Sequence, residues 1–292
     1  MSTVHSYSVG NGDMFSIRHD SDNCTIIDCS ISDGYKNWLL GEIDKQREGK
    51  GIIRFISTHP DEDHLMGLAT LDEHIKIINF YTVENKATKE NETPDFKCYK
   101  RLRDGNNVFH LEKDCTRFWM NQTSYERDSS GIGILWPITS NEYFKEALKK
   151  AEGGESPNNI SPIITYSLQD GVNMAWLGDL ETNFLENIKG EILWPSVDIL
   201  FAPHHGRESG KIPNSILRTM DPKIIIIGEA PSNNLNYYGN YNTITQNTAG
   251  TIYFECVKNW VHIYVSSSNY SVDFLEHPGA YTYSNYIGSL AV

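Results

Sequence analysis

The chain has 292 residues, of which 39% are hydrophobic and 22% are charged. This composition is typical of a folded globular protein and excludes an intrinsically disordered one. The formal net charge of −13 repels phosphate backbones and therefore disfavours binding to nucleic acids. No apolar run approaches the roughly 20 residues of a membrane span, and the first residues lack the basic and apolar regions of a secretory signal. We therefore expect a cytoplasmic protein with no membrane association.

The first half of the chain predicts alternating short strands and helices. Apolar runs bounded by Gly, Asn and Asp indicate strands, whereas apolar residues spaced three and four apart indicate helices. In chain order we expect strands at 7–9, 14–17 and 24–28, a helix at 35–48, a strand at 52–57, a helix at 66–74 and a strand at 75–82. The segment at about 84–130 is polar, charge-mixed and weakly periodic, and we interpret it as an insertion.

Apolar runs of strand length return after this segment. We expect strands at 132–136, 163–168 and 174–177, a helix at 181–189, and strands at 197–202, 224–228, 251–255 and 261–265. The pattern is one of β-hairpins with intervening helices in two successive halves. It predicts an α/β (α+β) fold in which two mixed β-sheets pack face to face with helices outside, a four-layer αββα sandwich. We expect residues 1–292 to form a single domain.

The stretch HPDEDH at residues 59–64 places five ionisable side chains in six positions after the expected strand 52–57. Imidazoles and carboxylates together suit transition metals such as Zn²⁺ or Mn²⁺, whereas carboxylates alone favour Mg²⁺ or Ca²⁺. Acids that cap a following helix would explain one or two of these residues. Helix capping does not explain two histidines around three acids, so the sequence predicts a metal site.

Two later strands also end in residues of the types that bind metals. Gly178-Asp179 follows the expected strand 174–177, and His204-His205 follows the expected strand 197–202. Functional residues concentrate in short loops at strand ends. Three such loops with metal-binding residue types favour one shared site over three unrelated turns.

The order HxDxDHxxG, GD and HHG resembles the metallo-β-lactamase superfamily of hydrolases, and within it the hydrolase domain of ComEC-type competence proteins. Four further stretches agree with that branch: VGNGD at 9–13, TIID at 25–28, NIS at 159–161 and QNTAGTI at 246–252. The resemblance runs discontinuously from residue 7 to residue 265, interrupted by the segment 84–130. It implies the αββα fold and metal-dependent hydrolysis.

The same resemblance implies a site for one or two divalent ions, zinc or manganese. The implied metal ligands are His59, Asp61, Asp63, His64, Asp179 and His204. His59 and Asp61 would hold one metal position, and Asp179 would bridge this position to the second. His205 would stand beside the site, where it could contact a substrate oxygen or orient a ligand.

Two departures from the superfamily pattern favour one firmly held ion and a second, looser one. Asp61 replaces the second imidazole of the more usual HxHxDH, and no histidine between His110 and His204 can serve as the third-motif ligand. Asp28, after the strand 24–28, would orient a ligating imidazole through its free N–H. Its alternative role is that of a turn-forming residue.

These residues predict a metal-dependent hydrolase that uses metal-activated water, most directly on a phosphodiester substrate. Asp63 or Asp179 would accept hydrogen bonds from the attacking water, and His205 would assist the leaving group. One alternative is a nuclease acting on DNA or RNA, for which the basic stretch FKCYKRLR at 96–103 could provide a local track. Another is a catalytically degenerate metal-binding or interaction protein, because the third-motif histidine is missing.

Overall fold

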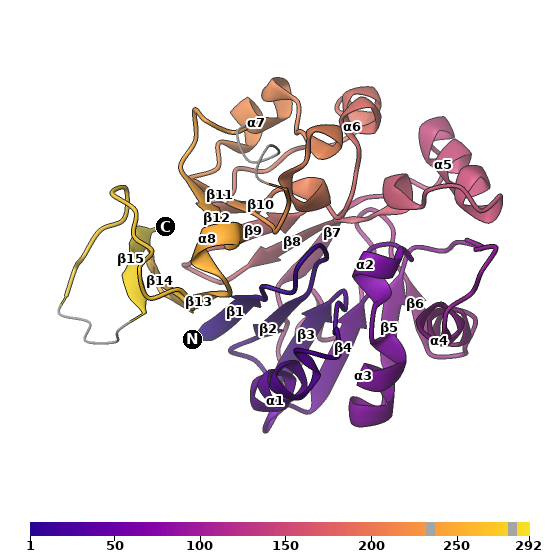
Figure 1. Cartoon of the computed structure of the whole chain (residues 1–292), viewed down its shortest axis with the longest axis horizontal. Coiled ribbons are helices and arrows are strands. Elements are labelled where there is room, and N and C mark those ends of the chain that lie inside the picture. Colours follow the sequence, from indigo (N-terminus) through magenta and orange to yellow (C-terminus); the bar gives the residue numbers. More distant parts are fainter. Residues whose placement is uncertain (232–236, 280–284) are drawn as a thin grey trace.

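Two β-sheets packed face to face form the centre of the protein (Figure 1). A computed structural model describes residues 1–231, 237–279 and 285–292 of the chain. Helices cover the outer face of each sheet, so the molecule has the expected four αββα layers. The predicted fold class is therefore confirmed.

The larger sheet has nine strands and contains the N-terminus. In spatial order they are β15 (Tyr286–Ala291), β14 (Trp260–Val265), β13 (Ile252–Val257), β1 (Ser2–Ser6), β2 (Phe15–Arg18), β3 (Asn23–Ile27), β4 (Ile52–Ile56), β5 (Asn79–Thr82) and β6 (Val108–His110). Strands β15 to β3 pair antiparallel, whereas β3 to β6 pair parallel.

Among the described residues, the smaller sheet has six strands, all of which follow β6 in the chain. In spatial order they are β12 (Thr243–Thr245), β11 (Ile224–Ile227), β10 (Ile199–Phe201), β9 (Asn173–Trp176), β8 (Ile163–Ser167) and β7 (Ile132–Trp136). Strands β12 to β9 are parallel, and β9, β8 and β7 are antiparallel. Both sheets thus combine parallel and antiparallel pairing.

The helices lie on the two outer faces and in the loops between strands. They are α1 (Lys36–Arg47), α2 (Glu62–Leu65), α3 (Leu68–Ile75), α4 (Pro94–Arg103), α5 (Glu142–Glu152), α6 (Thr182–Ile188), α7 (Asn214–Met220) and α8 (Gln246–Ala249). Among the described residues, none of the helices combines the length and the apolar character that a membrane crossing requires.

Aromatic side chains hold the two sheets together. The ring of Phe15 on β2 lies 5.1 Å from that of Phe201 on β10 and 6.1 Å from that of Trp176 on β9. A second apolar cluster lies outside the larger sheet, where Leu39 of α1 and Phe96 of α4 are buried. Burial of this apolar surface is the main term that stabilises such a fold.

The expected strands of the two sheets are present with small shifts at their ends, except at the N-terminus. The predicted strand at 7–9 is wrong, because the first strand is β1 (Ser2–Ser6), which pairs with both β2 and β13. Ser2 and Ser6 are buried although they are polar, so the apolar pattern did not mark this strand. The segment 84–130, expected as an insertion, contributes α4 and the edge strand β6.

In both sheets, parallel strands end close to the predicted site. Strand β4 leads directly into the HPDEDH stretch, and β9 and β10 lead into Asp179 and His204-His205. Ligands commonly bind at the carboxyl ends of parallel strands. The fold therefore places the three candidate loops at the junction of its two sheets.

Candidate metal centre

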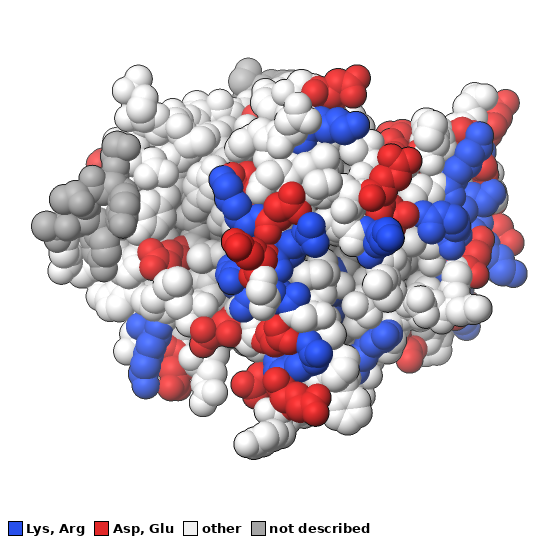
Figure 2. All heavy atoms as spheres, turned by 90° about the horizontal axis from the view of Figure 1, so that it is seen from below, with Lys and Arg blue, Asp and Glu red and all other residues white. Residues whose placement is uncertain are grey.

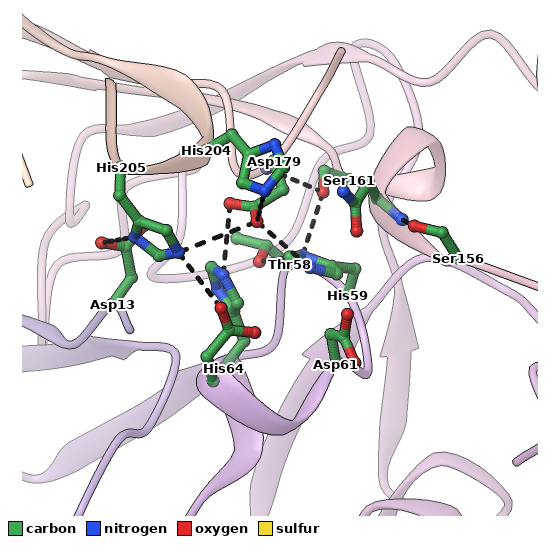
Figure 3. A network of polar contacts seen from close by, with 12 residues as sticks. Asp13, Thr58, His59, Asp61, His64, Ser156, Ser161, Asp179, His204 and His205 are labelled. Atoms are coloured by element: carbon green, nitrogen blue, oxygen red, sulfur yellow. Dashed lines mark hydrogen bonds and ion pairs between the residues drawn. The ribbon is translucent and has the colours of Figure 1, made fainter. Parts of the chain in front are cut away.

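The carboxylate of Asp179 lies at the centre of the three loops (Figure 3). Its Oδ1 is 3.2 Å from Nε2 of His64. Its Oδ2 is 3.8 Å from Nε2 of His59 and 3.8 Å from Nε2 of His204. The loops after β4, β9 and β10 thus meet at one point, as the sequence predicts.

Four side chains form the tightest group at this point. Asp63, His64, Asp179 and His205 each present a ligand atom, and all four atoms lie within 4.8 Å of one another. Nε2 of His205 is 3.3 Å from Oδ2 of Asp63 and 3.9 Å from Oδ2 of Asp179. Two imidazoles and two carboxylates in one cluster suit a divalent transition metal.

Buried polar atoms without partners show that this donor set fits a cation. Nε2 of His59 is buried and has no hydrogen-bond partner among the described residues, while Nε2 of His64 and Oδ1 of Asp179 are buried and face each other at 3.2 Å without a hydrogen bond of good geometry. An unsatisfied buried polar group costs about 1–3 kcal/mol, so the unpaired Nε2 of His59 is unfavourable in a purely structural cluster. A metal ion bound there would satisfy all three.

Asp28 orients His64. Its Oδ2 accepts a hydrogen bond from Nδ1 of His64 at 2.9 Å, and its Oδ1 accepts one from the backbone N–H of Thr58 at 2.7 Å. This arrangement directs Nε2 of His64 towards Asp179. The predicted contact of Asp28 with an imidazole of the candidate site is present, and its positive φ of 56° also makes it a turn residue.

Asp13 does the same for His205, and sequence reasoning gave it no role. Its Oδ1 lies 3.1 Å from Nδ1 of His205, which leaves Nε2 to face Asp63. Asp13 belongs to the VGNGD stretch, which was recognised only as a family-like motif. A carboxylate paired with a buried histidine far along the chain is visible only in three dimensions.

Carboxylates hold two of the histidines in the charged form. Burial disfavours charge, but Asp179 and Asp28 outweigh it and raise the pKa of His64 well above its ordinary value. Burial is likewise outweighed at His205, whose pKa is raised to about 10 by the nearby carboxylates. Two imidazoliums then balance two carboxylates. A divalent ion can replace the two protons without changing the charge of the group.

His59 and His204 are neutral instead. Burial, together with the charge of His64, lowers the pKa of His59 to about 4. Burial also lowers the pKa of His204. Nδ1 of His59 lies 3.1 Å from the hydroxyls of both Thr58 and Ser161. Thr58 donates its own proton to Asp28, so Nδ1 of His59 can donate to Thr58, and in that tautomer its Nε2 carries a free lone pair.

Ser161 contacts His59. The chain has no histidine between His110 and His204 that could serve as a third-motif ligand. Its hydroxyl lies 3.1 Å from Nδ1 of His59 and accepts the backbone N–H of Asp179 at 3.3 Å. A Cβ at Gly178 would lie 2.6 Å from Cβ of Ser161, and the φ of Gly178 is +52°. Only glycine fits there. The stretches NIS and GD, seen separately in the sequence, therefore form one packed unit.

The turn that carries the two adjacent histidines is strained. His204 and His205 have φ of 52° and 56°, values that non-glycine residues adopt at a cost of about 1–3 kcal/mol each. This backbone conformation directs the two imidazoles towards different neighbours. His205 is fully buried beside Asp13 and Asp63, whereas His204 is 14% exposed. This geometry favours His205 as the ligand and His204 as the neighbour, the reverse of the expectation from sequence.

Asp61 is the one expected ligand outside the convergent set. Its Oδ1 accepts a hydrogen bond from Nζ of Lys89 at 2.8 Å and one from the N–H of Glu62 at 2.9 Å. In Figure 3 no dashed line joins it to the other side chains. The structure thus brings together five of the six expected ligands and His205.

Comparison with known proteins agrees with this architecture. Residues 7–104 match the family model of the metallo-beta-lactamase superfamily. This match covers 98 of the 292 residues and includes the HPDEDH stretch, but neither Asp179 nor the two adjacent histidines. A search of curated proteins finds no match.

Two solved structures are similar to the chain at low identity. One is Igni18, a novel metallo hydrolase from the hyperthermophilic archaeon Ignicoccus hospitalis KIN4/I, with 14% identity, a TM-score of 0.48, and 87% of this chain and 99% of that chain covered. Another is CmlA, a diiron beta-hydroxylase from Streptomyces venezuelae, with 10% identity, a TM-score of 0.42, and 78% of this chain and 44% of that chain covered.

Replacement of Asp28 by Asn should weaken metal binding without unfolding the protein. The variant keeps the shape of the side chain but loses the charge that holds Nδ1 of His64. We expect the affinity for Zn²⁺ to fall about 10–100-fold, measured by competition with a chromophoric chelator. Asp33→Asn, at an exposed loop position, is the matched control. Equal affinities of D28N and D33N would contradict the role of Asp28.

Proposed function

We propose that this protein is a metal-dependent hydrolase that cleaves phosphodiester substrates. The observation that carries this proposal is the convergence of buried ligand atoms of His59, His64 and Asp179, of which Nε2 of His59 has no hydrogen-bond partner among the described residues. A structural scaffold has no use for such an arrangement, so the site supports an enzyme over a degenerate interaction protein. The closer likeness to ComEC-type domains rests on sequence motifs and stays a prediction.

Asp63, His64, Asp179 and His205 would hold the more tightly bound ion, and Asp179 would share its other oxygen with a second position near His59. A divalent metal ion supplies, when bound, a Lewis acid for the ester oxygen and a lower pKa for water. Asp28 and Asp13 fix the two charged imidazoles in place. Asp63, half-buried at the site, can accept a hydrogen bond from the attacking water.

His204 is the best placed group to move a proton. Ser209 lies 2.9 Å from its Nδ1, and Nη1 of Arg207 lies 3.3 Å from its Nε2. A guanidinium can only donate, so Nε2 carries the lone pair and Nδ1 the proton. His204 is therefore a neutral imidazole whose Nε2 accepts a hydrogen bond from Arg207 at the edge of the site. It takes over the proton-transfer role that sequence reasoning gave to His205.

Arg207 favours a phosphodiester over a neutral ester. Its guanidinium bonds both His204 and the side-chain oxygen of Asn11, so it is fixed at the edge of the site. Arg recognises phosphate oxygens through charge-assisted hydrogen bonds. A substrate that carries a negative charge next to the scissile bond would gain from this contact.

A nucleic-acid substrate has less support. Three of the four cations of α4, which the sequence offered as a basic track, are paired with acids: Lys100 with Glu92, Arg101 with Asp72 and Arg103 with Asp104. Figure 2 shows acidic and basic side chains interleaved over the face seen from below. With a net charge of −13, these pairs favour a small phosphodiester.

Loss of Asp63 should remove both metal and activity. We expect Asp63→Ala to lower hydrolysis of bis-(p-nitrophenyl) phosphate at least about 100-fold and to reduce the bound metal measured by mass spectrometry. Chelation with EDTA should abolish the wild-type activity, and added Zn²⁺ or Mn²⁺ should restore it. Glu73→Ala, exposed on α3, should behave as wild type. Metal binding without turnover would instead support the interaction protein.

Replacement of Arg207 by Gln should weaken the hydrolysis of phosphodiesters and leave that of neutral esters unchanged. Loss of one charge-assisted contact predicts a rise in KM of about tenfold for bis-(p-nitrophenyl) phosphate. Hydrolysis of the uncharged ester p-nitrophenyl acetate, if present, should not change. Arg218→Gln, exposed on α7, serves as the control. An unchanged KM for the phosphodiester in R207Q would remove the argument for that substrate class.

A further inference from the structure

The loop before α4 and the first turn of α4 contact the HPDEDH stretch and the residues around the start of α3 through four hydrogen bonds. Lys89 bonds Asp61 at 2.8 Å, and the hydroxyl of Thr93 bonds Glu62 at 2.9 Å. The two oxygens of Asp95 each accept a backbone N–H, one from Gly67 and one from Ala69, both at 2.9 Å. This part of the polar segment is therefore attached to the HPDEDH stretch and to the start of α3.

Lys89 is fixed in place. Its side chain is only 20% exposed, and its ammonium lies 5.6 Å from the centre of the Phe96 ring and 3.7 Å from Glu62. The preceding residue, Thr88, is bonded through its N–H and its hydroxyl to carbonyls at the end of α5. An ordinary surface lysine has no such support.

The carboxylate of Asp61 therefore makes its hydrogen bonds outside the metal centre. Its Oδ1 caps the N-terminus of α2 and receives the Lys89 ammonium. The carboxylate is nevertheless a neighbour of His59, with which it interacts electrostatically. The position near His59 is therefore left with neutral imidazoles and a share of Asp179. By contrast, the group around His64 has two carboxylates of its own.

We propose that Lys89 sets the metal content of the site by withholding Asp61, so that one ion is held tightly and the second only weakly. The inference rests on the proposed metal-dependent function, of which it specifies the metal stoichiometry. A cavity of about 250 Å³, lined by Asp61 and Lys89 among others, lies beside the pair. Removal of the ammonium therefore frees the carboxylate from its charged partner, beside a neighbouring His59 with which it already interacts electrostatically.

The test counts ions and needs no substrate. Metal-free full-length protein is titrated with Zn²⁺ and separately with Mn²⁺ by calorimetry, and bound metal is measured by mass spectrometry after gel filtration. Wild type should retain one ion per chain, and Lys89→Met should bind a second ion at least about tenfold more tightly than wild type. Lys86→Met, an exposed position in the same loop, should match wild type.

Two further variants test whether the gain acts through Asp61. Asp61→Asn alone should keep the metal content of wild type, and the double variant K89M/D61N should lose the gain of K89M. The inference is overturned if D61N loses an ion, if wild type holds two ions equally tightly, or if K89M binds the second ion no better than wild type. D61N decides the question even if K89M does not fold. Absence of metal from every variant would overturn the proposed function itself.

Discussion

The buried carboxylate of Asp179 is the feature on which the site depends. It lies between the imidazoles of His59, His64 and His204, and one of its oxygens has no hydrogen-bond partner among the described residues. A carboxylate at such a place requires positive charge nearby. Protons on His64 and His205 provide this charge in the metal-free chain, and a divalent ion can take their place.

Both sheets are needed to build this arrangement. The larger sheet supplies Asp28, His59 and His64 from the ends of β3 and β4, and the smaller sheet supplies Asp179 and His205 from the ends of β9 and β10. Aromatic packing between the sheets fixes the distance between these loops. The strained backbone of the histidine turn and the close approach at Gly178 are tolerated because the surrounding core is tightly packed.

Much of this architecture could be predicted from the sequence, since strands such as β7 and β11 are short, strongly apolar runs. The convergence of the HPDEDH, GD and HHG stretches also followed from their places at strand ends. The strand Ser2–Ser6 could not be predicted because its buried side chains include serines and a histidine. The roles of His204 and His205 depend on two positive φ angles, and spacing alone cannot reveal them.

Long-range polar pairs were equally beyond the sequence. Nothing in the order of residues shows that Asp13 would meet His205, or that Lys89 would engage Asp61. Each contact joins two segments that come together only after the sheets have packed. Such contacts decide which of the available side chains are free to bind a metal, and so they refine a site whose existence the motifs already indicate.

The most direct test is a crystal structure of the Zn²⁺-loaded protein with anomalous diffraction at the zinc edge. The account predicts an anomalous peak about 2.0–2.2 Å from Nε2 of His64, Nε2 of His205 and the carboxylates of Asp63 and Asp179. A peak held by other residues, or no peak between these four side chains in metal-saturated crystals, would contradict it.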